Sequence, residues 1–183
     1  MIDDKFYFKF ILPLVFHVRD QPPLQPDDGP IAIVLAPTRE LVQQIHNVAQ
    51  PYFNMFGIKS LCIIGGDERE KQINEIGAGK EVYICTPGRL SEFLESKITT
   101  LYRVTFIVLD EADKMLDLGF EPQVRGILAD FKTPKSSRLI IDELFDFFQN
   151  DQNYFYLVNR NRPYDVKLKF RCSLQLGQNQ SKS

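Results

Sequence analysis

Residues 104–113 read VTFIVLDEAD, and this stretch decides the fold. Residues 104–109 form an apolar run rich in β-branched side chains, which is typical of a strand that is buried on both faces. Two acidic residues, Asp110 and Glu111, follow this run without a spacer. Ligands of open α/β sheets bind beyond the carboxyl ends of the strands, so both acidic residues are candidates for a functional site.

Three further apolar runs lie upstream, at residues 31–36, 59–64 and 81–85. Each run is followed by a turn and an amphipathic stretch, and a further helix is expected at residues 8–18. Strand, turn and helix repeated in this way predict an α/β fold with a mostly parallel sheet flanked by helices.

The expected helices begin and end at recognisable residues. Thr38 is a candidate N-cap for a helix that ends before Pro51. Asp67 and Glu70 form a pair that is expected to cap the next helix. Pro87 lies in the first turn of the helix expected after residues 81–85, where a missing N–H loses no hydrogen bond within the helix.

Length and charge limit the classes of function. A chain of 183 residues with 44% hydrophobic content predicts one globular domain. The 22 basic and 24 acidic residues give a net charge of -2, so no basic excess indicates a nucleic-acid partner. Backbone N–H groups at helix N-termini can nevertheless bind phosphates without one.

The cysteines and the apolar N-terminal stretch bear on compartment. Cys62, Cys85 and Cys172 are far apart without metal-ligand spacing, so we expect neither a zinc site nor disulfides. An intracellular location, nucleus or cytoplasm, is therefore expected. Residues 6–18 are too short to span a bilayer and are interrupted by a lysine and a proline, so we expect no membrane segment and no signal peptide.

Neither the acidic pair nor the Gly65-Gly66 pair identifies a function when taken alone. An acidic residue after a strand can hold hydrated Mg²⁺ on nucleotide phosphates, and a neighbouring carboxylate can orient a water molecule. The alternative for the acidic pair is a solvated turn, and for the glycines an ordinary turn.

Four motifs in a fixed order give these residues a context: APTREL at 36–41, GG at 65–66, TPGRL at 86–90 and DEAD at 110–113. Together they resemble the first RecA-like domain of the DEAD-box RNA helicases. The resemblance covers residues 8–131 and leaves 1–7 and 132–183 unmatched.

The resemblance implies an ATP-dependent enzyme that unwinds short RNA duplexes, with ATP and Mg²⁺ as cofactors and RNA and ribonucleoprotein components as partners. Asp110 would hold Mg²⁺ through water, Glu111 would act as catalytic base, and Asp113 would link the nucleotide site to neighbouring motifs. Contacts to the RNA sugar-phosphate backbone are implied for Pro37, Thr38, Arg39, Gly65, Gly66, Thr86, Gly88 and Arg89.

General physical chemistry supports these contacts. Thr38 and Thr86 stand where a strand gives way to a helix, so each offers a hydroxyl and free N–H groups to a phosphate. Glycines let two backbones approach closely. Because such contacts do not depend on base identity, binding independent of RNA sequence is expected.

The chain departs from the family at both ends of the matching region. The family register places the phosphate-binding lysine at Phe6 and the Mg²⁺-binding threonine at Tyr7, so no P-loop is expected and the sheet should be incomplete at its start. The loop at 77–80 is no substitute, because Glu81 follows its lysine. The register of the family's Ser-Ala-Thr motif falls on residues 141–143, which read IDE.

Nothing in residues 132–183 resembles a second RecA-like domain, and we expect this aromatic, Asn/Gln-rich segment to be poorly packed. Hydrolysis needs phosphate positioning, metal and charge stabilisation together, so this chain alone should turn over little ATP. The alternative is a non-catalytic RNA- or protein-binding module derived from a helicase.

Overall fold

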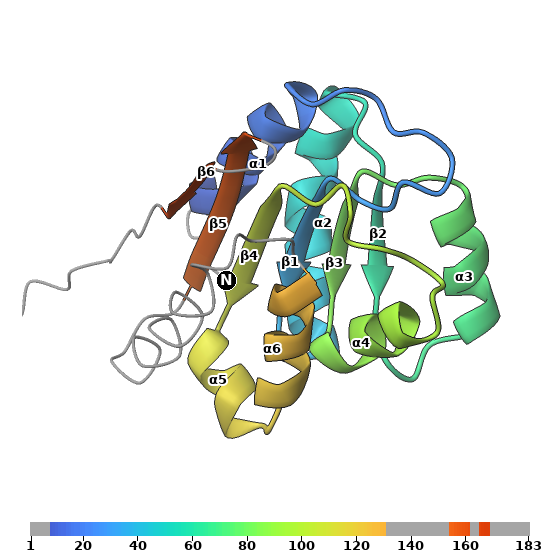
Figure 1. The fold of residues 1–183 in the computed structure, drawn as a ribbon, viewed down its shortest axis with the longest axis vertical. Coiled ribbons are helices and arrows are strands. Elements are labelled where there is room, and N and C mark those ends of the chain that lie inside the picture. Colours follow the sequence, from blue (N-terminus) through green and yellow to red (C-terminus); the bar gives the residue numbers. More distant parts are fainter. Residues whose placement is uncertain (1–7, 131–153, 162–164, 169–183) are drawn as a thin grey trace, which may run out of the picture.

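The computed structural model describes the backbone of residues 8–130, 154–161 and 165–168, and these residues form six helices and six strands (Figure 1). The helices are α1 (Phe8–Arg19), α2 (Arg39–Met55), α3 (Arg69–Gly77), α4 (Pro87–Glu95), α5 (Ala112–Asp117) and α6 (Glu121–Asp130). The strands are β1 (Ala32–Leu35), β2 (Ser60–Ile63), β3 (Val82–Cys85), β4 (Phe106–Asp110), β5 (Tyr154–Asn161) and β6 (Asp165–Leu168).

All of the strands belong to one sheet, in the order β2-β3-β1-β4-β5-β6. The first four in this order are parallel, and in the common register Leu35 lies between Cys85 and Leu109. The predicted α/β fold with a mostly parallel sheet is thereby confirmed. So are the predicted helix at 8–18 and the four strands found from apolar runs.

Helices cover both faces of the sheet (Figure 1). Helices α1 and α2 pack with Val34, Ile84 and Val108 on one face. Residues of α4, α5 and α6 pack with Leu35 and Leu109 on the other, with partly buried isoleucines of α3 against them. Because successive side chains of a strand point to opposite faces and both faces are buried, the strands are continuous apolar runs.

Helix α2 runs through Pro51 and ends at Met55, so the prediction that it ends before Pro51 was wrong. Pro51 is exposed and has no N–H to donate to the preceding turn. The helix continues because Ala49 and Phe53, on either side of the proline, are both buried in the core. Tertiary packing here outweighs the local preference.

Helix α3 begins at Arg69 with Glu68 as its N-cap, and no side chain caps it by a hydrogen bond. The predicted capping pair of Asp67 and Glu70 was therefore wrong. The carboxylate of Asp67 instead accepts a hydrogen bond from Arg39 at 2.6 Å. A charge-assisted bond to a guanidinium is stronger than a bond to a neutral backbone N–H.

Strands β5 and β6 lie in the C-terminal segment, to which the sequence analysis assigned no element. Strand β5 pairs antiparallel with β4, from Phe106 opposite Val158 to Asp110 opposite Tyr154. It therefore occupies the edge of β4, whose N–H and C=O groups would otherwise face outward. The predictions for residues 1–7, 141–143 and Cys172 lie outside the described residues.

Candidate functional site

The four parallel strands end at one edge of the sheet, the carboxyl edge, toward which their arrows point at the bottom of Figure 1. Every sequence-predicted site residue follows one of these strands or closes it. Along this edge the structure brings together residues 65–66 after β2, 86–89 after β3, 37–39 after β1, and 110–113 at the end of β4.

The turn between β1 and α2 presents a capped helix and an exposed cation. Thr38 is the N-cap, and its Oγ1 accepts a hydrogen bond from the N–H of Leu41 at 3.2 Å. The hydroxyl proton of Thr38 is left to donate to a ligand, because a hydroxyl can accept and donate together. Arg39 follows as the first residue of the helix, with 44% of its side chain exposed.

The loop after β2 lies against that cation. Gly66 has a φ of +78°, and a Cβ atom at this position would stand 2.4 Å from Nη1 of Arg39. The guanidinium of Arg39 is held there by Asp67, whose Oδ1 is 2.6 Å from Nη2. Only glycine combines this backbone conformation with so close an approach, so the first two motifs form one surface.

The turn between β3 and α4 presents a helix start without a side-chain cap. Thr86 is the N-cap but makes no capping hydrogen bond through its side chain, and Pro87 follows at the first turn. The ring of Phe120 lies 3.9 Å from where a Cβ of Gly88 would be. The hydroxyl of Thr86 and the first amides of α4 are therefore not committed to a cap.

Arg89, in the same turn, is mostly buried, with 12% of its side chain exposed. Its Nε lies 3.1 Å from Oε2 of Glu92, and its guanidinium lies over the ring of Phe93 at 5.5 Å. Arg69 reaches the same carboxylate at 2.9 Å and the same ring at 5.8 Å. One buried nitrogen of Arg89, Nη1, has no hydrogen-bond partner. Arg89 thus packs into the domain, whereas Arg39 faces outward.

Asp110 closes β4 and is 1% exposed. The pKa of its carboxyl is raised to about 7, chiefly by burial and in part by the negative charges of Glu111 and Asp113, while a backbone hydrogen bond from Glu111 acts in the opposite direction. Its Oδ1 is buried without a hydrogen-bond partner. A buried acceptor without a partner is costly in free energy and marks this carboxylate as a candidate for ligand binding.

Glu111 adopts a left-handed backbone conformation, with φ and ψ both 50°. Such strain in a residue other than glycine is concentrated at functional sites. The Glu111 carboxylate is half-exposed and lies 3.1 Å from Nζ of Lys114. Asp113 lies in the first turn of α5 and is partly buried.

The residues present fit a hydrated magnesium ion. Among the described residues no group of three or more potential ligands could enclose a metal ion. Mg²⁺ keeps most of its water shell and is bound through one or two carboxylates together with substrate phosphates. The unpartnered oxygen of Asp110 and the nearby carboxylates of Glu111 and Asp113 suit that mode of binding.

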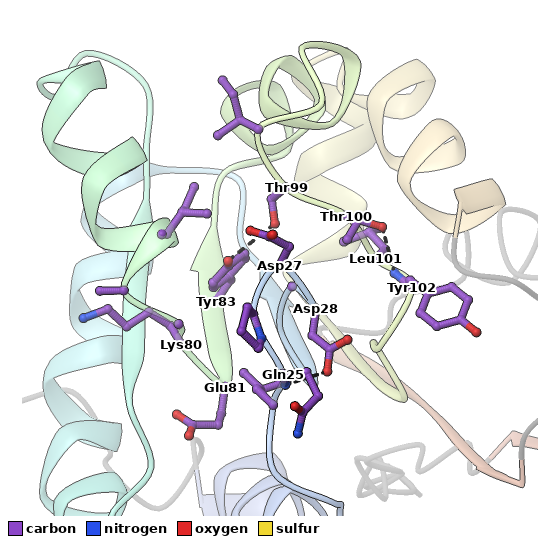
Figure 2. Close-up of a pocket in the computed structure, with 18 of the residues that line it drawn as sticks. Gln25, Asp27, Asp28, Lys80, Glu81, Tyr83, Thr99, Thr100, Leu101 and Tyr102 are labelled. Atoms are coloured by element: carbon purple, nitrogen blue, oxygen red, sulfur yellow. Dashed lines mark hydrogen bonds between the residues drawn. The ribbon is translucent and has the colours of Figure 1, made fainter.

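A pocket of ≈ 1080 Å³ lies at the opposite edge, where the strands begin (Figure 2). Figure 2 shows side chains from the loop before β1, including Asp28, and from the loop before β4, including Thr99 and Tyr102. None of the sequence-predicted site residues lines it.

Within the described part of the chain, no helix has the length and apolar character needed to cross a bilayer.

Three residues outside the predicted set contact the site. Asp67 pairs with Arg39, Glu92 pairs with Arg89, and the buried side chain of Gln72 hydrogen-bonds the residue before Gly65. Glu92 could have been found from its spacing, because residues three apart on a helix are neighbours. Asp67 and Gln72 leave no comparable signal in the sequence.

Comparison with known proteins agrees with the arrangement of the motifs. A family model described as DEAD/DEAH box helicase matches residues 8–142. The pre-mRNA-processing ATP-dependent RNA helicase PRP5 of Gibberella zeae is 45% identical over 133 residues, which is 71% of this chain and 11% of that protein. The probable ATP-dependent RNA helicase DDX17 of Mus musculus is 53% identical over 119 residues, 65% of this chain and 18% of that protein.

The crystal structure of the yeast DEAD-box splicing factor Prp28 superposes with a TM-score of 0.66 at 37% identity, covering 72% of this chain and 31% of that one. The expected RecA-like α/β fold is thereby confirmed. The chain spans only a small part of the relatives it matches, between 11% and 18% of the two curated helicases named above.

Proposed function

This chain belongs to the DEAD/DEAH box helicase family, and on that premise we propose that it binds RNA by the sugar-phosphate backbone at the carboxyl edge. One observation carries the proposal: motifs far apart in the sequence converge on one edge, where Arg39 lies against Gly66. The contacts are assigned to Pro37, Thr38, Arg39, Gly65, Gly66, Thr86, Gly88 and Arg89.

These residues contribute different interactions. Arg39 supplies the exposed positive charge, and the N-termini of α2 and α4 supply backbone N–H groups with a favourable helix dipole. Gly65 and Gly66 let the RNA backbone approach the loop closely. Arg89 acts chiefly by holding α4 in place, since its guanidinium is mostly buried. Such contacts are independent of base sequence.

In a complete enzyme of this family, which would use ATP and Mg²⁺, the acidic residues would form the nucleotide site. Asp110 would accept hydrogen bonds from the water shell of Mg²⁺, an ion that neutralises charge on the phosphates of bound ATP. Glu111 would accept a proton from the attacking water, and Asp113 would orient the neighbouring motifs. We propose that hydrolysis by this chain is negligible, because Phe6 and Tyr7 stand in the register of the P-loop lysine and threonine.

A non-catalytic binding module remains the second candidate, favoured by the presence of the backbone-contact motifs together with Phe6 and Tyr7 in the register of the P-loop lysine and threonine. Two relatives are described as a pre-mRNA-processing helicase and a splicing factor. Ribonucleoprotein components in the nucleus or cytoplasm are accordingly proposed as further partners.

The RNA proposal is tested by titrating the 183-residue chain into fluorescein-labelled single-stranded RNA while anisotropy is recorded at several KCl concentrations. We expect saturable binding that weakens linearly on a log–log plot of affinity against salt. Two RNAs of different base composition and equal length should bind alike. Absence of saturable binding at low salt would contradict the proposal.

Catalysis is tested separately by phosphate release from Mg²⁺-ATP with and without RNA. The expected rate is indistinguishable from that of buffer. The matched control is Glu111→Gln, which changes the proposed base without altering the size of the side chain. Turnover that is present in the unsubstituted chain and lost in Glu111→Gln would instead establish an active ATPase.

A further inference from the structure

Gln72, in α3, is a buried polar residue outside the four motifs, with 6% of its surface exposed. Both ends of its carboxamide contact the backbone of one residue, Ile64. Nε2 donates to the carbonyl oxygen of Ile64 at 3.0 Å, and Oε1 accepts from its N–H at 3.2 Å. A side-chain amide that donates and accepts in this way makes the two hydrogen bonds that the backbone of a neighbouring strand would otherwise make.

Ile64 needs such a partner. It follows directly on β2, which is the first strand of the sheet and, among the described strands, pairs only with β3. Ile64 is itself 1% exposed, so water does not reach its N–H and C=O groups. A buried backbone group without a partner destabilises the fold, and Gln72 satisfies both groups at once.

The residues after Ile64 are those of the proposed RNA surface. Gly65 and Gly66 come next in the chain, and Gly66 lies against the guanidinium of Arg39. Asp67 then pairs with that guanidinium at 2.6 Å. The loop is therefore fixed at one end by the buried amide of Gln72 and at the other by Arg39.

We propose that Gln72 is a positioning residue for RNA binding: its amide sets the path of the Gly65-Gly66 loop and, through it, the place of Arg39. This role rests on the RNA-binding function proposed above. Gln72 would not touch RNA, because its side chain is enclosed and both polar ends are engaged.

The alternative is that Gln72 only stabilises the fold, and a matched control separates the two. Thr105 is buried to a similar extent, with 5% exposed, and its hydroxyl is 2.8 Å from Nε2 of His17 at the opposite edge of the sheet. Gln72→Met removes two buried hydrogen bonds and Thr105→Val removes one part-buried hydrogen bond, each at little change in size. Both substitutions should lower the melting temperature, but of the two residues only Gln72 lies beside the Gly65-Gly66 loop.

The experiment measures RNA affinity by anisotropy, with the same labelled single-stranded RNA, at a temperature where circular dichroism shows every variant folded. Gln72→Met should weaken binding about tenfold, the loss of one well-placed charged contact. Thr105→Val should leave affinity within about twofold, since it lies remote from the RNA surface. Gln72→Glu keeps the acceptor for the Ile64 N–H but puts a carboxylate oxygen against the Ile64 carbonyl in a buried site, so it should weaken binding at least as much as Gln72→Met.

A double variant tests the route through Arg39. If the loop acts by placing Arg39, Gln72→Met should cost much less affinity when Arg39 is already alanine. Equal affinities for Gln72→Met and the unsubstituted chain, or equal losses in Gln72→Met and Thr105→Val, would overturn the positioning role alone. Absence of binding by the unsubstituted chain would overturn the RNA-binding function and this role with it.

Discussion

The carboxyl edge has a basic half, residues 37–39, 65–66 and 86–89, and an acidic half, residues 110–113, and they differ in how far the chain satisfies their polar groups. In the basic half Thr38 caps a helix and Arg39 pairs with Asp67. The exceptions in the basic half are one buried nitrogen of Arg89, which has no partner, and the hydroxyl of Thr86, which makes no capping hydrogen bond. In the acidic half Asp110 has an oxygen without a partner, and Glu111 has strained backbone.

The basic half is therefore largely stabilised by contacts within the chain, whereas the acidic half needs a ligand to satisfy its polar groups. Because the basic half is ordered before RNA binds, binding should cost little conformational entropy. The acidic half holds three carboxylates. Among the described contacts the one cation paired with them is Lys114, and it pairs with Glu111. The acidic half should therefore destabilise the free domain, whereas the basic half should not.

The largest expected effect is the stabilisation of the domain by Asp110→Asn. The pKa of Asp110 is raised from 3.8 to about 7, so the folded state holds this proton more tightly than the unfolded state does. The stability contribution is thus fully present below pH 3.8 and is lost as pH rises to about 7, above which both states are ionised and the loss is complete. At pH 8 the substitution should add on the order of a few kcal/mol to the free energy of unfolding.

Urea unfolding between pH 5 and pH 8 measures this gain, which should grow with pH. The exposed carboxylate of Asp117, in the same helix as Asp113, supplies the control Asp117→Asn, which makes the same substitution at a site that is not buried. A loss of stability in Asp110→Asn at pH 8 would show that the acidic half is already satisfied in the free chain.

A smaller effect is expected for Arg89→Ala, which should lower the free energy of unfolding by about 1–3 kcal/mol, because it removes a mostly buried side chain together with its ring contact and its ion pair to the partly exposed Glu92. Arg69→Ala is the matched control. Arg69 shares Glu92 and Phe93 with Arg89, but 44% of its side chain is exposed. Urea unfolding should show a smaller loss for Arg69→Ala; equal losses would contradict the structural role assigned to Arg89.

The smallest effect on stability is expected for Arg39→Ala, within about 0.5 kcal/mol, because an exposed ion pair contributes little. Its effect should fall on RNA instead, with weaker binding and a log–log salt slope reduced by about 0.7. Arg125→Ala, which removes an exposed arginine paired with Glu121 on α6, should change neither affinity nor slope. A slope unchanged by Arg39→Ala would remove this residue from the RNA surface.

Local sequence signals predicted much of the fold and the placement of the motifs. Continuous apolar runs located the parallel strands, because both faces of this sheet are covered by helices. Thr38 was recognisable as a cap because capping depends on residues three positions apart.

Interactions between distant residues were not predictable in the same way. The pairing of Asp67 with Arg39 and of β5 with β4 depends on the folded arrangement, and local propensity carries no trace of it. Pro51 remained within α2 because of buried neighbours, against its own preference. The burial of Arg89 likewise depends on its contacts with Glu92 and Phe93 of α4, a helix that packs against the sheet.

The central claim, that RNA lies on the basic half of the carboxyl edge, is tested most directly by amide hydrogen exchange of the 183-residue chain with and without saturating single-stranded RNA. Slower exchange is predicted at residues 38–41, 65–67 and 88–91, with no change around the opposite pocket at Asp28 and Tyr102. Protection confined to that pocket, or to residues 110–113 alone, would contradict the claim.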